Sequence, residues 1–192
     1  MTTDTIQWNA HAHVDKFDED QVKFVRGKTG LLEPKAADFI QLGIDPSDSI
    51  DKPGNLLTTA GLTRLVSLLN GAGGQALTNT ATRIGTGNGG GSAAVGDTAL
   101  SASAGAANQW WQIMDATFPS ASGAVLTAKS TFGTADGNYV WAEWAIDVGT
   151  PTVSSSAVVS ATGPMMNHKT AAALGTKASG SIWAFTVTVT FS

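Results

Sequence analysis

Residues 182–191 alternate strictly between two sets of side chains. The large apolar set comprises Trp183, Phe185, Val187, Val189 and Phe191. The other set comprises Ile182, Ala184, Thr186, Thr188 and Thr190. Because successive side chains of a strand point to opposite faces of a sheet, this period of two predicts a half-buried β-strand.

Further strand candidates follow from residue 81 onward. They cover residues 81–85, 108–118, 124–133 and 139–148, and the last two flank the dipeptide Asp136-Gly137. Asp-Gly between two β-rich runs is a strong hairpin signal, so we expect residues 124–148 to form a hairpin. The glycine run at 85–92 lacks the Gly-Lys-Ser/Thr ending of a phosphate-binding loop and is interpreted as a flexible loop.

One helix is predicted in the second part of the chain, over residues 55–70. Asn55 is a suitable N-cap, and Leu62, Leu65, Val66 and Leu69 follow at the spacing of one helix face. A single apolar stripe implies that this helix packs onto a sheet. No comparable set of helices is evident for a bundle.

Charge divides the chain at about residue 54. Residues 1–54 hold ten Asp/Glu and six Lys/Arg, whereas residues 55–192 hold five of each. The first part is interpreted as an extended N-terminal arm, with a short extended piece at 22–25 and a short helix that Pro34 opens and Gly43 closes. Its apolar content is too high for a free tail, so we expect it to dock on a partner. Disorder until assembly is the alternative.

The predicted fold is therefore mainly β, an antiparallel, jelly-roll-like β-sandwich with one packed α-helix and an extended N-terminal arm. The arm covers residues 1–54 and the body covers residues 55–192. Low charge on the body favours association with further copies or with a partner, because a soluble monomer normally displays a mixed charged surface.

Aromatic side chains are the candidate interface residues. Trp110 and Trp111 are neighbours and Trp141 and Trp144 differ by three, so each pair points to both faces of an extended strand. Bulges or a two-layer core that hide all four are the alternative. A sugar-binding platform is a second use of such rings. The full set of interface candidates is Trp8, Phe17, Phe24, Phe39, Trp110, Trp111, Trp141 and Trp144.

Catalytic and metal chemistry find little support. His11 and His13 have a metal-compatible spacing but no evident third ligand, so no metal site is predicted. His168 is interpreted as a hydrogen-bonded structural histidine. Glu143 and Asp147 would lie about 13 Å apart along a strand, whereas glycosidase pairs need about 5 to 9.5 Å. We expect no enzyme and no cofactor.

Other classes of partner are also disfavoured. The formal charge of −4 and the lack of clustered Lys/Arg argue against nucleic acid. No apolar run approaches the roughly 20 residues needed to cross a bilayer, and no signal peptide is evident. The chain has no cysteine, which fits assembly in a reducing cytosol.

Four stretches between residues 55 and 192 carry a resemblance to a known group. They are NLLTTAGLTRLVSLLNGAGG, TATRIGTGNGGGSAAVGDTALSA, QIMDATFPSASGAVLTAKSTFGTADGNYVWAEWAID and MMNHKTAAALGTKASGSIWAFTVTVTFS. In this order they resemble the β modules of tailed-bacteriophage virion proteins. The resemblance implies a capsid decoration protein or a part of a tail or head fibre, usually trimeric, and it brings no catalytic residues. The N-terminal 54 residues lie outside it.

The expected function is a capsid decoration protein of the virion. It would bind the outside of the assembled shell through its arm and one face of the β body, with the major capsid protein and further copies of itself, in a trimer, as partners. It would be assembled in the host cytoplasm and reside on the capsid exterior. The alternatives are a tail or head-fibre component that binds host-surface glycan, and a carbohydrate-binding or hydrolytic module.

Overall fold

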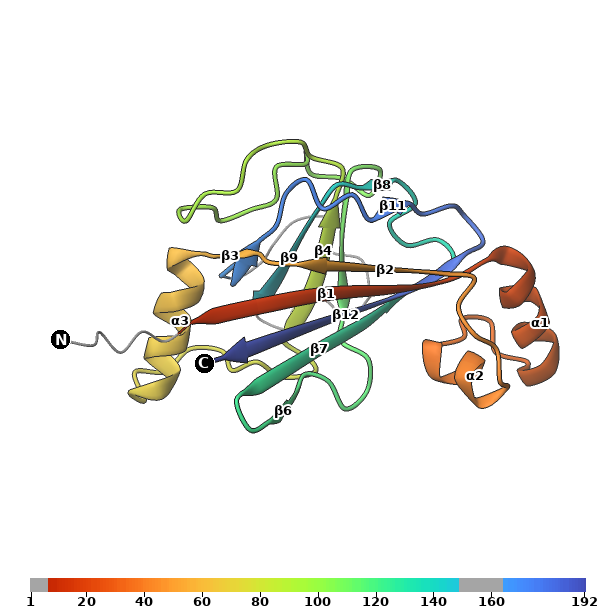
Figure 1. Cartoon of the computed structure of the whole chain (residues 1–192), viewed down its shortest axis with the longest axis horizontal. Helices are drawn as coiled ribbons and strands as arrows, with labels where there is room; N and C mark the ends of the chain where they lie inside the picture. The colour runs from red at the N-terminus through yellow and green to blue at the C-terminus, as the bar shows by residue number, and fades with distance from the viewer. Residues whose placement is uncertain (1–6, 149–163) are drawn as a thin grey trace.

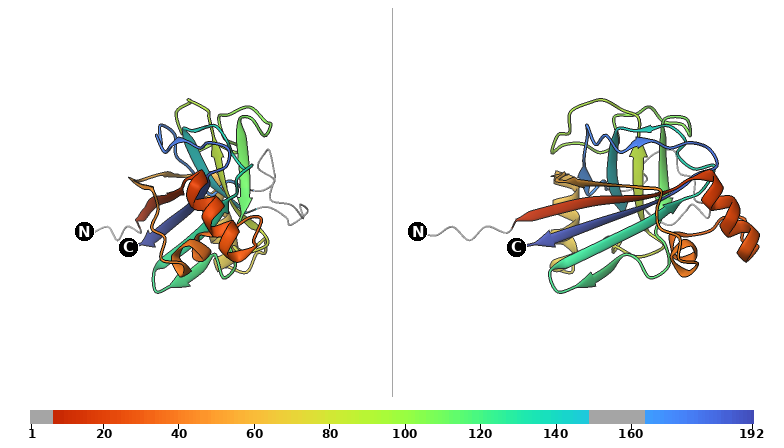
Figure 2. Two further views of the ribbon diagram at one scale, coloured as in Figure 1. Left: turned by 90° about the vertical axis from the view of Figure 1, so that its right-hand side faces the viewer. Right: turned by 45° about the vertical axis from the view of Figure 1, so that its right-hand side comes forward.

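The computed structural model describes residues 7–148 and 164–192, which form two antiparallel sheets (Figures 1 and 2). The larger sheet has the strand order β2-β1-β12-β7-β6 and the smaller one has the order β5-β4-β9. In Figure 1 the strands of the smaller sheet run across the direction of the larger one. The prediction of a mainly β, antiparallel fold is confirmed.

The bounds of the elements are as follows. The larger sheet comprises β1 (Trp8–Phe17), β2 (Asp48–Pro53), β6 (Ser120–Ser122), β7 (Val125–Phe132) and β12 (Ile182–Phe191). The smaller sheet comprises β4 (Thr82–Gly87), β5 (Gln109–Ile113) and β9 (Glu143–Val148). Two short pairs are formed by β3 (Leu56–Leu57) with β10 (Asn167–His168) and by β8 (Val140–Trp141) with β11 (Gly175–Thr176). The helices are α1 (Glu19–Thr29), α2 (Ala36–Gln41) and α3 (Thr59–Leu69).

The N-terminal segment differs from the expected extended arm. Residues 8–17 form the strand β1. This strand pairs with β12 along ten positions, from Trp8↔Phe191 to Phe17↔Ile182, and with β2 on its other side. Alternate positions such as Ala12 and Val14 are fully buried. The long alternating C-terminal strand thus pairs with a strand from the other end of the chain. Residues 8–17 and 48–53 belong to the larger sheet, and the helices α1 and α2 lie between them in sequence.

Residues 22–25, expected to be extended, lie within the helix α1. Asp18 caps this helix by accepting a hydrogen bond from the Gln21 backbone N–H at 2.9 Å, while the Gln21 side chain accepts one from the Asp18 N–H at 3.1 Å. This reciprocal capping box favours a helix start there. Val22 and Val25 are buried against Phe17 and Phe39 in a separate apolar cluster, so tertiary packing overrides the β preference of the valines.

The hairpin predicted across Asp136-Gly137 does not form. Strand β7 pairs with β12 and β6, whereas β8 pairs with β11 and β9 with β4. The turn is real, since Gly137 adopts a φ of 62°, but it carries the chain from one sheet to the other. Turn chemistry alone does not choose the partner of a strand, and β12 offers β7 a longer ladder.

The main core lies between the two sheets and is rich in aromatic rings. Trp141 contacts Phe132 at a centroid distance of 4.6 Å and Trp183 at 4.7 Å, and Trp144 contacts Phe185 at 5.5 Å. The alternating face of β12 predicted from the sequence therefore points into this core. The other face of β12 is also buried at its start, beneath α1 and α2.

Helix α3 begins four residues later than expected. Thr58, rather than Asn55, is the N-cap: its hydroxyl accepts a hydrogen bond from the Gly61 N–H at 2.9 Å and donates one to the Met165 carbonyl. Asn55 instead accepts a hydrogen bond from the Trp8 indole N–H at 2.6 Å. Figure 1 shows α3 at one end of the larger sheet, with α1 and α2 at the other.

Candidate functional site: an apolar groove on helix α3

An apolar groove lies between α3, the first residue of β1 and the last residue of β12. It has a volume of about 560 Å³. Among residues 7–148 and 164–192, the side chains that line it are apolar, namely Trp8, Leu57, Leu62, Leu65, Val66, Leu68, Leu69 and Phe191. In sequence these residues come from three separate regions, and the pairing of β1 with β12 brings two of those regions together.

Contacts within the fold keep the groove in place. Trp8 and Phe191 pack edge to face with centroids 5.5 Å apart, and the Trp8 indole is held by its hydrogen bond to Asn55. On the inner side of α3, Gly61 lies against the backbone of Met166 so closely that a Cβ atom there would clash. The absence of that Cβ lets α3 sit directly on the strand-like segment at 165–168.

Three large side chains of α3 remain in solvent. Leu62 is 52% exposed, Val66 is 50% exposed and Leu69 is 88% exposed. Their spacing of four and three residues places them on one helix face. Contiguous exposed apolar surface of this kind is typical of sites that contact another protein, a membrane or an apolar ligand.

A second hollow of about 730 Å³ lies on the other side of α3. Its lining includes the hydroxyl side chains of Thr59, Thr63 and Ser67, the glycines at 73 and 74, and Arg64. Arg64 donates a hydrogen bond to the Gln75 carbonyl at 3.3 Å. The flank of α3 at this hollow carries hydroxyl groups and an arginine among apolar residues such as Ala60 and Pro164, whereas the flank at the groove is lined by apolar side chains.

A buried acid–histidine cluster holds the loop that precedes β5. The ring nitrogens of His168 contact Asp97 at 2.6 Å and Glu143 at 2.8 Å. Glu143 also accepts hydrogen bonds from the backbone N–H groups of Ser101 and Ala102 at 2.8 and 2.7 Å. The interpretation of His168 as a structural, hydrogen-bonded histidine agrees with this arrangement, and the glycine-rich residues before Ser101 are thereby attached to the smaller sheet.

Electrostatics in this cluster favour the charged forms. Burial lowers the pKa of His168, but its bonds to Glu143 and Asp97 outweigh burial and leave the pKa above its ordinary value. Burial raises the pKa of Glu143, but the bonds from His168 and from the backbone outweigh it and leave the pKa below its ordinary value. The pKa of Asp97 is lowered in the same way, by the Ala94 N–H and His168 against its own desolvation.

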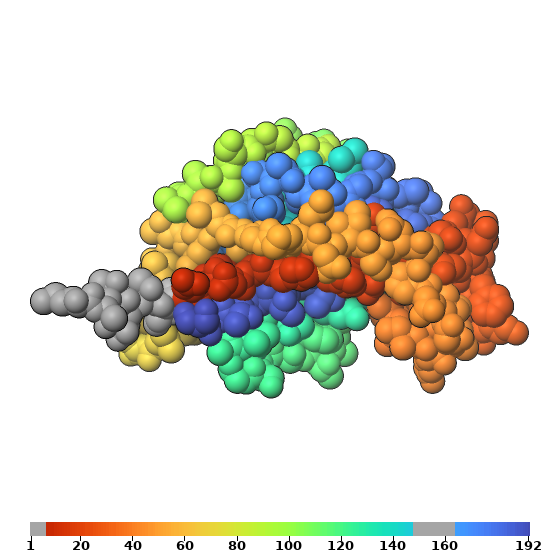
Figure 3. All heavy atoms as spheres, viewed as in Figure 1, coloured from red at the N-terminus to blue at the C-terminus, as the bar shows by residue number. Residues whose placement is uncertain are grey.

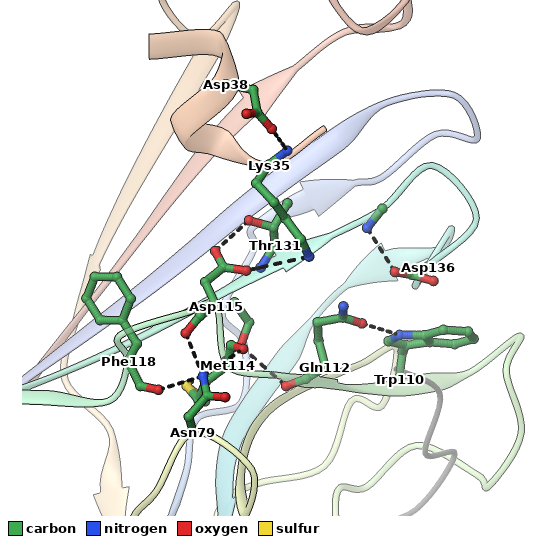
Figure 4. Close-up of polar contacts among 12 residues, drawn as sticks. Lys35, Asp38, Asn79, Trp110, Gln112, Met114, Asp115, Phe118, Thr131 and Asp136 are labelled. Carbon is green, nitrogen blue, oxygen red and sulfur yellow. Dashed lines mark hydrogen bonds and ion pairs between the residues drawn. The ribbon is translucent and has the colours of Figure 1, made fainter. Parts of the chain in front are cut away.

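A polar seam joins α2, β5 and β7 (Figure 4). Asp115 accepts hydrogen bonds from the Thr131 hydroxyl at 2.6 Å and the Thr131 N–H at 3.1 Å, and its carboxylate lies 3.6 Å from the Lys35 ammonium. Asn79 donates to the carbonyls of Met114, Asp115 and Phe118. These groups satisfy one another, so the seam is best described as a structural link between the layers.

The predicted interface residues fall into two groups. Five of them are buried, and they are Phe17, Phe39, Trp111, Trp141 and Trp144. Trp8 and Trp110 are half-buried and Phe24 is 51% exposed. Trp8 alone of this set lines the groove on α3. The alternative that bulges or a two-layer core hide the tryptophans holds for Trp111, Trp141 and Trp144. Trp110 is only half-buried, and its indole N–H donates to the Gln112 side chain at 2.9 Å (Figure 4).

Sequence reasoning missed the exposed leucines of the groove. The helical stripe was interpreted as the face that packs onto the sheet, but only Leu65 of that stripe contacts the main core. Gly61 was the available signal: a glycine inside a helix costs about 1 kcal/mol relative to alanine and indicates a close approach on its own side. The side that faces the sheet is therefore the one that carries Gly61.

The two histidines of β1 lie on the outward face of the larger sheet, which Figure 3 shows as uncovered strands β1, β2 and β12. His13 contacts Asp51 and Asp15, each at 2.9 Å, and His11 lies 3.5 Å from Asp51. Across residues 7–148 and 164–192, no group of three or more His, Asp or Glu side chains has an arrangement that would hold a metal ion. None of the described helices combines the length and the apolar character needed to span a membrane.

Comparison with known proteins identifies no relative. Neither the models of protein families, nor the curated proteins, nor the solved structures contain a match to this chain.

Proposed function

We propose that this chain is a structural subunit of a bacteriophage particle, a capsid decoration protein that binds the outside of the assembled shell. The observation that carries the proposal is the exposed apolar groove on α3, a surface suited to protein contact. The resemblance of residues 55–192 to tailed-phage virion modules supplies the class of assembly. The proposed partners are the major capsid protein and further copies of this chain, arranged as a trimer.

The contact surface of this proposal differs from the arm inferred from sequence. Because β1 is a central strand of the larger sheet, residues 8–17 cannot leave it without breaking the ladder to β12. The groove on α3 takes over the role of the docking surface. Many weak apolar contacts of this kind, repeated over a lattice, would add up to firm attachment through effective concentration.

A tail or head-fibre subunit is the second candidate. Its host-surface binding would use the tryptophan region. Trp141 and Trp144, which are also the residues expected to bind sugar in a carbohydrate-binding module, both have an exposed fraction of 0%. Of the four tryptophans in β5, β8 and β9, Trp110 is half-buried and the other three are buried. Trp110 is therefore the candidate among them for contact with a sugar.

Quantitative mass spectrometry of purified virions tests the assignment. A copy number that equals the major shell protein, or is a simple fraction of it, supports lattice decoration. A handful of copies per particle favours the tail or fibre, and absence of the chain from particles would overturn both.

A pair of variants tests the groove itself. Leu69→Asp should weaken binding to assembled shells at least tenfold, because a buried leucine contributes about 1.5–3 kcal/mol and an aspartate adds a desolvation cost. Ile40→Asp is the matched control, since Ile40 is 65% exposed on α2 at the opposite end of the sheet. Equal binding of both variants would contradict a role for α3.

A further inference from the structure

Lys177 is a buried amine between β11 and β12. The residue is only 1% exposed. Its backbone N–H donates to the Tyr139 carbonyl at 3.0 Å, which anchors it beside the loop that connects β7 to β8. Its side-chain nitrogen donates to two neutral oxygens, the Gly133 carbonyl at 2.7 Å and the Asn138 side-chain oxygen at 2.9 Å. A buried lysine held by neutral acceptors is unusual, because the charged amine loses its hydration.

Asn138 presents an electrophilic carbon to this amine. Its Oδ1 atom lies 2.9 Å from Lys177 Nζ, and a carbonyl bond is about 1.2 Å long, so Nζ lies no more than about 4.1 Å from Asn138 Cγ. The amide is also oriented, because its nitrogen donates to the Thr134 carbonyl at 3.0 Å. Asn138 is otherwise exposed, so a group that leaves from this nitrogen has direct access to water.

The surroundings shift the pKa values of both Lys177 and Asp136. Burial lowers the pKa of Lys177 to about 8, against the opposing charges of Asp136 and Glu33. Near pH 8 about half of the amine is then neutral and nucleophilic. Burial also raises the pKa of Asp136, although the Gly133 N–H donates a hydrogen bond to this carboxyl group at 2.9 Å. Figure 4 shows this contact at the edge of the polar seam.

We propose that Lys177 and Asn138 join in an intramolecular amide cross-link between the β7–β8 loop and the segment before β12. The neutral amine of Lys177 attacks Asn138 Cγ and forms the new C–N bond. The bond from Cγ to Asn138 Nδ2 breaks, the proton lost by Nζ is transferred to Nδ2, and ammonia leaves to solvent. No oxidant, metal or other reactant is needed. Asp136 is assigned as a positioning residue, because its carboxyl group accepts a hydrogen bond from the N–H of Gly133, whose carbonyl holds the Lys177 amine.

The cross-link would join residues 39 positions apart, at the point where the chain passes between the two sheets. It would tie the start of β12, the strand at the centre of the larger sheet, to the loop that leads into the tryptophan-rich core. A covalent tie at this position opposes the separation of the sheets. This chemistry is independent of docking at α3.

The intact mass of the purified full-length chain tests the proposal. We expect a mass about 17 Da below that of the otherwise identically processed sequence, the mass of one ammonia lost when the amide forms. Proteolysis should release a branched peptide that joins residues 138 and 177. A wild-type chain that keeps its full mass after prolonged incubation above pH 8 would overturn the proposal, whatever any variant does.

Four variants sharpen the result. Lys177→Arg and Asn138→Ala should both keep the full mass, whereas the control Lys169→Arg should still lose ammonia, since the Lys169 amine donates to the Pro53 carbonyl at 3.4 Å and not to Asn138. In Asp136→Asn, the cross-linked fraction reached at a fixed time should fall and its dependence on pH should change. An unchanged fraction and pH profile would overturn the role assigned to Asp136.

Discussion

Helices cover both ends of the five-stranded sheet, and each end exposes some apolar side chains, but the two ends bury different amounts. Helices α1 and α2 expose Phe24 and Ile40 and bury an apolar cluster beneath them, whereas α3 leaves Leu62, Val66 and Leu69 exposed. Phe39 of α2 stacks on Phe17 of β1 with ring centroids 4.0 Å apart, and both are buried. At the other end, Leu69 is 88% exposed. The α1–α2 end thus holds a stacked, buried aromatic pair, whereas the exposed side chains of the α3 end line an open groove.

The attachment of the two ends also differs in kind. The α1–α2 end is held by an apolar cluster that includes Val22, Val25 and Ile182. The α3 end is held by the Thr58 cap, by the pairing of β3 with β10 and by the Thr59 N–H, which donates to the Val95 carbonyl at 2.7 Å. Apolar packing is insensitive to pH, whereas the α3 end lies beside the titratable cluster of His168, Glu143 and Asp97, which includes a residue of β10.

The largest loss of stability is expected at the α1–α2 end. Phe39→Ala should lower the free energy of unfolding by about 3–5 kcal/mol, because it removes a fully buried ring and leaves a cavity. Urea unfolding measures this loss. Ile40→Ala, one position along and largely exposed, should change the stability by less than about 0.5 kcal/mol. Similar values for the two variants would contradict a packed α1–α2 end.

A smaller loss is expected where α3 meets the sheet. Gly61→Ala should destabilise the fold by about 1–3 kcal/mol, because the new methyl group meets the Met166 backbone. Gly27→Ala in α1 is the control, since nothing lies within 4 Å of the Cβ position there, and it should stabilise the fold by up to about 1 kcal/mol. A gain in both variants would show that α3 does not rest on residue 166.

The pH dependence should distinguish the two ends. Stability from the lowered pKa values of Glu143 and Asp97 is present above their unfolded pKa values and is lost as pH falls through the folded ones. Stability from the raised pKa of His168 is complete below its unfolded pKa and is lost as pH rises through the folded one. Hydrogen exchange should therefore show protection of the α3 end that is greatest between these limits. Protection of α3 that follows α1 at every pH would contradict this difference.

The smallest effect on folding is expected in the groove. Leu69→Asp should change the free energy of unfolding by less than about 0.5 kcal/mol, because the side chain is already in solvent. Thermal unfolding of the variant and the wild type measures the difference. A loss comparable with that of Phe39→Ala would mean that Leu69 supports the fold rather than an interface.

Local patterns predicted several elements correctly. The alternation in 182–191 identified β12 and its core-facing side chains, and the spacing of leucines identified α3 to within a few residues. The candidate site was harder to predict. Leu65 and Leu69 belong to the same apolar stripe, but only the packing of Gly61 on Met166 decides which of them is covered.

Long-range pairing accounts for most of what the patterns could not predict. From the local sequence, residues 8–17 are expected to belong to an irregular, acidic arm. In the structure they pair with β12 along ten positions. Asp136-Gly137 signals a turn but does not identify the strands on either side as partners. His168, Asp97 and Glu143 are separated by at least 25 positions and meet only after the smaller sheet has formed.

The sequence by itself determined that the chain is mainly β, that β12 is an alternating strand and that α3 is amphipathic, because these follow from side-chain period and local capping. The tertiary structure alone decided that β1 is a central strand, that Trp141 and Trp144 are core residues and that the groove on α3 is open. It also brought Lys177 against Asn138. Each of these depends on which distant segments pair, and that choice is made by the summed burial of the whole fold rather than by any local propensity.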